Sequence, residues 1–278
     1  MEGKIIKILS NDYTVLSNNI NYVCKSRGKF RNLNITPLVG DNVLFDEKNK
    51  YILEIFKRKN SLVRPPIANI DQCVIVTSST EPEFSSNLLD KLLTIVEFNN
   101  IKPIICFTKM DKLNEKELDN IKSIMKYYQK IGYEVYDNRE LDSLKKIFKN
   151  KITVFTGQSG AGKSTLLNKL DNYLNLKTDE ISFALNRGKH TTRHVELLKI
   201  CDGFIADTPG FSAVSFIDMT NSDIRDNFIE FNKYRDNCEY KDCMHNNEKN
   251  CEIKRKINEN EILNSRYENY LKFINREK

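Results

Sequence analysis

The first 67 residues are dominated by short apolar runs of the kind that form β-strands. Five such runs lie at Lys4–Leu9, Tyr13–Leu16, Tyr22–Lys25, Asn42–Phe45 and Tyr51–Ile55. Glycine and asparagine separate them, and no long helical period interrupts the series. Many short strands in succession are typical of a small β-barrel. We therefore predict a barrel over residues 1–67.

From residue 68 to residue 220 the pattern changes to strands that alternate with helices. Strands are predicted at Asn69–Val76, Ile101–Ile105 and Ile152–Thr156, and helices at Asn87–Phe98 and Leu113–Ile131. This alternation predicts an α/β domain built on a mainly parallel sheet. Beyond residue 220, apolar side chains recur at helical spacing from Ile253 to Ile274. They predict a mainly helical third domain over residues 221–278, whose apolar face packs on its own domain.

A phosphate-binding loop follows the third predicted strand. The residues Gly157-Gln158-Ser159-Gly160-Ala161-Gly162-Lys163-Ser164 fit the pattern G-x-x-x-x-G-K-[ST], with Thr165 next in the helix that follows. In a strand–loop–helix setting, backbone N–H groups and the helix N-terminus face the phosphates. Lys163 would neutralise the β- and γ-phosphates, and the Ser164 hydroxyl would ligate Mg²⁺.

Two further segments carry the features of γ-phosphate sensing. Asp207-Thr208-Pro209-Gly210 follows an apolar run, so Asp207 would hold the Mg²⁺ shell and the N–H of Gly210 would contact the γ-phosphate. Between this motif and the phosphate loop lies a basic segment, residues 187–194, that contains Thr191 and Thr192. Either threonine could sense the γ-phosphate and Mg²⁺, and the sequence does not decide between them.

A guanine-reading box, Thr108-Lys109-Met110-Asp111, precedes the phosphate loop. The Asp111 carboxylate can accept hydrogen bonds from N1–H and the N2 amine of guanine, a pair that adenine lacks. Asp111 therefore favours GTP over the ATP of a P-loop ATPase or kinase. The first position is Thr108, where Asn is usual, so the box has a hydroxyl and no amide, and we expect looser anchoring of the loop. In ordinary GTPases this box follows the phosphate loop, so the order here indicates a circular permutation.

The C-terminal region contains a candidate zinc site. Cys238, Cys243, His245 and Cys251 lie close together in an Asn- and Lys-rich stretch with little to bury. Three cysteines and one histidine form the closed ligand set of structural zinc sites, which leaves no open position for catalysis. The other cysteines include Cys24, Cys73 and Cys106, which lie in strand contexts and are expected to be buried thiols. We therefore expect a soluble, reduced and cytoplasmic protein.

The positive charge of the chain is concentrated on the predicted barrel. Residues 1–67 hold 12 Lys and Arg against 6 Asp and Glu, whereas the whole chain has 44 and 38, so the remainder is balanced. The densest basic runs are residues 25–31 and 57–59. A basic patch on a barrel indicates binding to nucleic acid phosphates. No apolar run is long enough to cross a membrane.

Together these motifs, in this order, resemble the ribosome small-subunit-dependent GTPase A family, also called RsgA or YjeQ. The resemblance spans nearly the whole chain. It implies an N-terminal OB-fold, a circularly permuted GTPase domain and a C-terminal zinc-binding domain. It also implies a role in late maturation of the small ribosomal subunit and its RNA, with GTP hydrolysis stimulated by that subunit. The motifs themselves predict Mg²⁺ with GTP and one Zn²⁺ per chain. We expect a monomer.

The segment after Asp207-Thr208-Pro209-Gly210 lacks the glutamine that positions water in Ras-like enzymes. The family resemblance points instead to His190, whose imidazole could orient or deprotonate the water. A second interpretation is a zinc-stabilised RNA-binding module in which GTP is only a structural ligand. Turnover with and without small subunits separates the two interpretations. No Ser-Ala-type motif marks the last guanine contact, which we would seek near residues 134–138.

Overall fold

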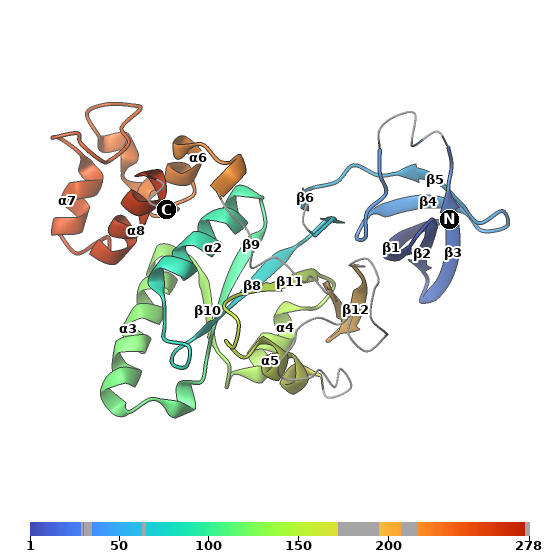
Figure 1. Cartoon of the computed structure of the whole chain (residues 1–278), viewed down its shortest axis with the longest axis horizontal. Helices are drawn as coiled ribbons and strands as arrows, with labels where there is room; N and C mark the ends of the chain where they lie inside the picture. The colour runs from blue at the N-terminus through green and yellow to red at the C-terminus, as the bar shows by residue number, and fades with distance from the viewer. Residues whose placement is uncertain (29, 31–34, 63–64, 172–194, 207–215, 276–278) are drawn as a thin grey trace. The chain divides into compact units, whose positions relative to one another are not determined.

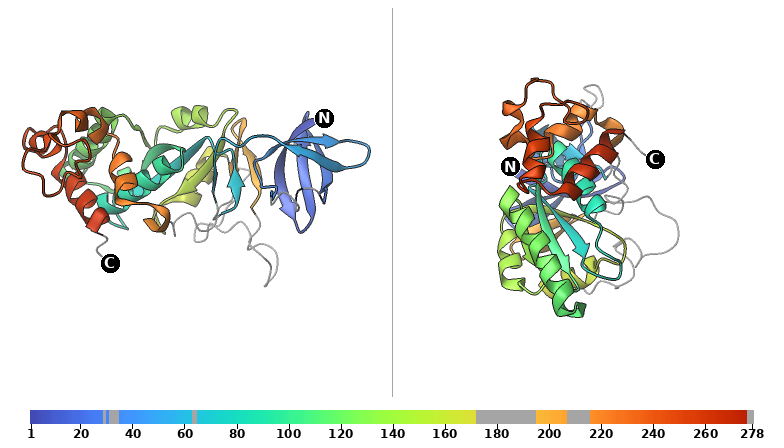
Figure 2. Two further views of the ribbon diagram at one scale, coloured as in Figure 1. Left: turned by 90° about the horizontal axis from the view of Figure 1, so that it is seen from above. Right: turned by 90° about the vertical axis from the view of Figure 1, so that its left-hand side faces the viewer.

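The computed structural model describes residues 1–28, 30, 35–62, 65–171, 195–206 and 216–275. They form two compact units. Figures 1 and 2 show the course of the chain, coloured from the N-terminus to the C-terminus. The first unit takes residues 1–74, 139–155 and 162–212, and the second takes residues 75–138, 156–161 and 213–278. The path of the chain therefore crosses between the two units several times.

The first five strands close into the predicted barrel. They are β1 (Glu2–Leu9), β2 (Asp12–Ser17), β3 (Ile20–Ser26), β4 (Asn42–Asp46) and β5 (Tyr51–Ile55). Their order around the barrel is β1-β2-β3-β5-β4, with β3 and β5 parallel and the other pairs antiparallel. Alternate side chains point inward, so Ile5, Val15, Cys24, Val43 and Phe45 are fully buried. The expected five-stranded barrel is thus confirmed.

A six-stranded sheet forms the centre of the α/β fold, in the order β10-β9-β8-β11-β13-β12. The strands are β8 (Gln72–Ser78), β9 (Lys102–Thr108), β10 (Glu134–Asp137), β11 (Ile152–Thr156), β12 (Leu197–Ile200) and β13 (Gly203–Ala206). The pairs β10/β9 and β11/β13 are parallel, and β12 and β13 form an antiparallel hairpin. The runs Cys73–Val76, Pro103–Thr108 and Ile152–Thr156 are continuously buried, as in sheets covered on both faces. A short ribbon, β6 (Ser61–Leu62) and β7 (Ile67–Ala68), precedes the sheet.

The connecting helices are α2 (Ser86–Phe98), α3 (Glu115–Ile131), α4 (Leu141–Ile147) and α5 (Lys163–Leu170). Helix α3 begins two residues later than predicted, because Asn114 and Glu117 form a capping box that fixes its start. Leu113 instead follows η1, a 3₁₀ helix of one turn that spans Met110–Lys112. The expected burial of Cys24, Cys73 and Cys106 is confirmed.

The C-terminal region is mainly helical, but the apolar face from Ile253 to Ile274 is divided between two helices. The elements are η4 (Phe216–Asp218), α6 (Asn221–Asp226), η5 (Phe231–Lys233), η6 (Arg235–Asn237), α7 (Glu252–Asn258) and α8 (Asn264–Asn275). Phe228, Phe231, Tyr270 and Phe273 form the centre of the core of this region, with ring centroids 5.1–6.2 Å apart. The Ile95 side chain of α2 also belongs to this core.

A buried ionic cluster joins α8 to α2. The Arg266 guanidinium donates to both carboxylate oxygens of Glu230 (2.8 and 2.7 Å) and to Oδ1 of Asp90 (2.7 Å). The Tyr128 hydroxyl and the Asn269 amide donate to the two oxygens of Asp90 at 2.6 and 2.7 Å. Arg266 is 1% exposed, Asp90 0% and Glu230 1%. Each charge therefore depends on the others for the hydrogen bonds that it loses from water.

We predict that Arg266→Met lowers the free energy of unfolding by about 3–5 kcal/mol, because it leaves two buried carboxylates without their cation. Urea unfolding followed by circular dichroism measures the loss. The matched control is Arg255→Met, since the Arg255 side chain is 63% exposed and pairs with Glu252 on its own helix. Its unfolding midpoint should stay unchanged. Equal losses in the two variants would contradict a special role for the buried cluster.

Candidate nucleotide and metal sites

The phosphate loop connects the end of β11 to the start of α5, as its motif predicts. Gly157, Gly160 and Gly162 have φ values of 135°, 75° and 88°, which L-side chains rarely adopt. A Cβ atom at Gly157 would also lie only 2.0 Å from the carbonyl oxygen of Val76 in β8. Glycine at this position therefore allows the loop to pass directly over the neighbouring strand.

Lys163 and Ser164, the last two residues of the phosphate-loop motif, lie in the first turn of α5. Ser164 is buried and Lys163 is half-buried. Burial lowers the pKa of the Lys163 ammonium group. A phosphate anion bound beside it would favour the charged form again, because opposite charges stabilise each other more strongly where water is excluded. Thr165 is exposed on the same turn.

The guanine box follows β9 at the same edge of the sheet. Thr108 is 2% exposed, and its hydroxyl donates to the carbonyl oxygen of Ala161 at 2.6 Å. The threonine therefore connects the box to the phosphate loop through its hydroxyl. Asp111 lies exposed in η1, where its carboxylate is accessible to a base.

A segment that no motif marked, residues 79–84, holds the other side of the guanine box. The Ser79 N–H donates to the Thr108 carbonyl at 3.1 Å, and the Ser79 hydroxyl donates to Sδ of Met110 at 2.9 Å. The ammonium of Lys109 donates to the Glu81 carbonyl, and Lys112 forms an ion pair with the Glu81 carboxylate at 2.8 Å. Because these contacts join short sequences about 30 residues apart, only the three-dimensional structure reveals them.

The predicted region of the last guanine contact, residues 134–138, forms β10 and the residue that follows it. Since Asp137 pairs with Phe107, Asn138 lies beside Thr108. The Asn138 N–H donates to the Phe107 carbonyl at 2.9 Å, and its Oδ1 is buried without a hydrogen-bond partner among the described residues. Asn138 is therefore a polar side chain in the region where we sought the last guanine contact, although the sequence there has no Ser-Ala motif.

The remaining predicted nucleotide contacts lie outside the described residues. They are His190, Thr191, Thr192, Asp207 and Gly210. The described chain before and between these segments consists of α5 and the β12–β13 hairpin. Helix α5 ends at Leu170, and the β12–β13 hairpin spans Leu197–Ala206.

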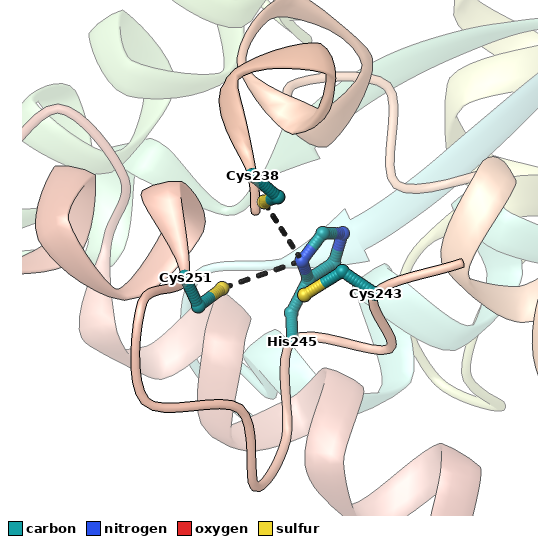
Figure 3. A group of neighbouring side chains, drawn as sticks. All are labelled: Cys238, Cys243, His245 and Cys251. Atoms are coloured by element: carbon teal, nitrogen blue, oxygen red, sulfur yellow. Dashed lines mark hydrogen bonds between the residues drawn. The ribbon is translucent and has the colours of Figure 1, made fainter. Parts of the chain in front are cut away.

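Cys238, Cys243, His245 and Cys251 converge in the C-terminal region (Figure 3). Their ligand atoms all lie within 4.8 Å of one another. The sulfur atoms of Cys238 and Cys251 lie 3.7 and 3.4 Å from Nδ1 of His245, so Nδ1 is the nitrogen that faces the centre. Zinc bonds of about 2.0–2.3 Å in a tetrahedron require ligand separations of roughly 3.4–3.8 Å. The donor set and its spacing therefore fit a metal ion such as zinc.

The surroundings of the four side chains favour this use. Burial, together with the nearby Arg225, lowers the pKa of His245 to about 4, so the imidazole is neutral, as a metal ligand must be. Burial raises the pKa of the Cys243 thiol to about 12, and a bound cation would reverse that shift. The Glu248 carboxylate accepts the N–H groups of Met244 and Asn246 at 2.7 and 2.8 Å, which fixes the loop between the ligands.

The barrel surface differs from the basic patch that charge counting suggests. In the run 57–59, Arg58 forms a double hydrogen bond with the fully buried Asp41, at 2.7 Å for each contact, and Lys59 forms an ion pair with Asp71. These two cations therefore stabilise the fold. Lys25 is exposed on β3 and pairs in register with Tyr51 of β5, whose side chain is 42% exposed. Among the described residues, no helix is both long and apolar enough to span a membrane.

Comparison with known proteins identifies the family. The RsgA GTPase model matches residues 55–217, and the RsgA N-terminal domain model matches residues 2–52. "Small ribosomal subunit biogenesis GTPase RsgA 2" of Oceanobacillus iheyensis is 50% identical over 281 residues, covering 98% of this chain and 96% of that protein. "Small ribosomal subunit biogenesis GTPase RsgA 1" of Listeria monocytogenes is 48% identical, covering 99% of this chain and 96% of that protein.

Two solved structures share the architecture over the whole chain. The circularly permuted GTPase YloQ superposes with a TM-score of 0.85 at 38% identity, covering 99% of this chain and 94% of that one. YjeQ from Thermotoga maritima superposes with a TM-score of 0.87 at 32% identity, covering 99% and 97%. The motif order, the fold and these relatives agree, and the chain belongs to the RsgA family of circularly permuted GTPases.

Proposed function

We propose that this GTPase assists the maturation of the small ribosomal subunit and hydrolyses GTP to GDP and phosphate while bound to it. The observation that carries the proposal is the hydrogen bond from Thr108 to Ala161, which unites the guanine box and the phosphate loop in one nucleotide site. The printed names of the relatives supply the biological setting. Parallel sheets bind ligands beyond the carboxyl ends of their strands, where β9 and β11 deliver these two motifs.

Each side chain has a distinct task in this proposal. Asp111 reads the guanine base, and Lys163 neutralises the β- and γ-phosphates. Ser164 and Asp207 would hold Mg²⁺, which would supply positive charge at the phosphates. Thr191 or Thr192, together with the N–H of Gly210, senses the γ-phosphate. His190 positions the water, since no glutamine follows Gly210.

The barrel supplies the contact with ribosomal RNA. The exposed Tyr51 ring offers a stacking surface for a base, and Lys25 beside it offers charge to the phosphate backbone. Arg27 is also exposed at the end of β3. We place this RNA-binding domain at residues 1–67, the permuted GTPase domain at 68–220 and the zinc-binding domain at 221–278. We also propose that the protein acts in the cytoplasm as a monomer.

We predict that Asp111→Asn weakens GTP binding by at least tenfold and weakens xanthosine triphosphate binding much less. Xanthine carries a carbonyl in place of the guanine amine, so an amide donor suits it better than a carboxylate does. Fluorescent-nucleotide titration measures both affinities. Asp119→Asn, at an exposed position on α3, is the matched control and should behave as the parent. Unchanged GTP affinity in Asp111→Asn would remove Asp111 from base recognition.

We predict one Zn²⁺ per chain, held by Cys238, Cys243, His245 and Cys251. Elemental analysis of protein purified without chelator measures it. Cys251→Ser should lose the metal and unfold the loop and helices around it, yet keep GTP affinity within a few-fold, because the nucleotide motifs lie elsewhere. Cys201→Ser, a cysteine outside the cluster, should keep the zinc. Parent protein without zinc would refute the assignment.

We predict that small ribosomal subunits accelerate hydrolysis strongly and that His190→Ala loses the acceleration while it keeps GTP and subunit binding. A positioned base contributes on the order of 10²–10⁴ in rate. Phosphate release under single-turnover conditions, with and without purified subunits, measures the effect, and His194→Ala is the control. Full stimulation of His190→Ala would exclude its catalytic role. A parent enzyme that subunits leave unchanged would favour the RNA-binding module with GTP as a structural ligand.

A further inference from the structure

Both segments that the sequence assigns to the γ-phosphate connect to the same end of the β12–β13 hairpin. Leu197 of β12 pairs with Ala206 of β13, so the start of one strand lies beside the end of the other. In the sequence, Leu197 follows the segment with His190, and Ala206 directly precedes Asp207. Both segments that the motifs assign to the γ-phosphate therefore attach to the same end of one short hairpin.

The barrel contacts that end of the hairpin directly. Nζ of Lys7 in β1 lies 2.7 Å from Oε2 of Glu196, the residue immediately before β12. The backbones of these two residues also form an antiparallel bridge. Their side chains are 31% and 37% exposed, so the ion pair is partly screened from water. The two residues lie 189 positions apart in the sequence.

The local structure of β1 explains why Lys7 is the residue that contacts Glu196. Strand β1 pairs with β4 through Glu2–Lys4, and the Ile5 backbone bonds to Gly40 and Asp41, so this edge is occupied as far as Ile5 and Lys7 lies beyond it. Its register against β2 shifts between Ile5 and Lys7. Such an irregularity bends a strand and re-aims the side chains beside it. Lys7 is the residue that meets Glu196.

From this geometry we infer that the Lys7–Glu196 contact couples the barrel to the end of the β12–β13 hairpin, so that a partner bound to the barrel and a nucleotide bound at the phosphate loop influence each other. The inference rests on the proposed function, because it explains how subunit docking could reach the nucleotide. The coupling is reciprocal. If the nucleotide state alters the hairpin end, it alters β1, and a ligand on the barrel alters the hairpin end by the same free energy. Lys7 and Glu196 are positioning residues, since neither touches the nucleotide.

Hydrogen exchange tests the coupling without any ribosome. The exchange of the β1 amides is compared between the GDP state and the state with a non-hydrolysable GTP analogue. In the parent, we expect β1 and β12 to respond together to the nucleotide. In Lys7→Ala and Glu196→Ala the response of β12 should remain, while that of β1 is lost. A β1 strand in the parent that exchanges identically in both nucleotide states overturns the inference.

Turnover supplies the second test. Lys7→Glu and Glu196→Lys should each lower subunit-stimulated hydrolysis by about fivefold, the scale of a partly exposed ion pair, while intrinsic turnover and subunit affinity persist. The double charge swap should restore stimulation. The matched control swaps Lys130 and Glu261, an exposed ion pair at 2.6 Å outside the barrel, and should keep the stimulation of the parent.

The outcomes separate the inference from the proposed function. A stimulated parent with equally stimulated Lys7 and Glu196 variants overturns the coupling and leaves the ribosomal function intact. If the parent is not stimulated, the ribosomal function fails, and the hydrogen-exchange comparison still decides whether the barrel and the hairpin end are coupled.

Discussion

The second compact unit depends on one buried arginine. Arg266 holds Asp90 and Glu230 inside a region from which water is excluded, and Tyr128 and Asn269 complete the hydrogen bonds of Asp90. Such a cluster adds little net stability compared with an apolar core, yet it admits only one arrangement of its partners. Here it joins α8 to α2 through hydrogen bonds from Arg266 and Asn269 to Asp90.

Helix α2 contacts both the Arg266 cluster and the start of the phosphate loop. Its N-cap Ser85 and its first turn line a small cavity together with Val76, Gly157 and Gln158, at the start of the phosphate loop. Asp90 lies one turn further along the same helix, where Arg266 holds it. The helix is thus fixed between the phosphate loop and the C-terminal region. Of the loop glycines, Gly157 lines this cavity, so α2 lies against the first residue of the phosphate loop.

Local patterns predicted the strands, the barrel, the phosphate loop and the cysteine cluster because each is encoded within a few neighbouring residues. The contacts that the sequence did not predict join distant residues. Asp90 and Arg266 are 176 positions apart, so no periodicity links them. Likewise, the basic run 57–59 indicates RNA binding by composition alone, although Arg58 and Lys59 neutralise Asp41 and Asp71. Composition gives the number of charges but not the partner of each charge.

The sequence distance across the Arg266 cluster has a consequence for synthesis of the chain. Translation proceeds from the N-terminus, so Asp90 leaves the ribosome long before α8, which spans Asn264–Asn275. Until then, the polar face of α2 has no cation to cover it and must remain hydrated. Contacts of such high sequence separation form late and slow folding. The barrel can close during translation, whereas the second unit becomes complete only after Arg266, 176 residues beyond Asp90, has been made.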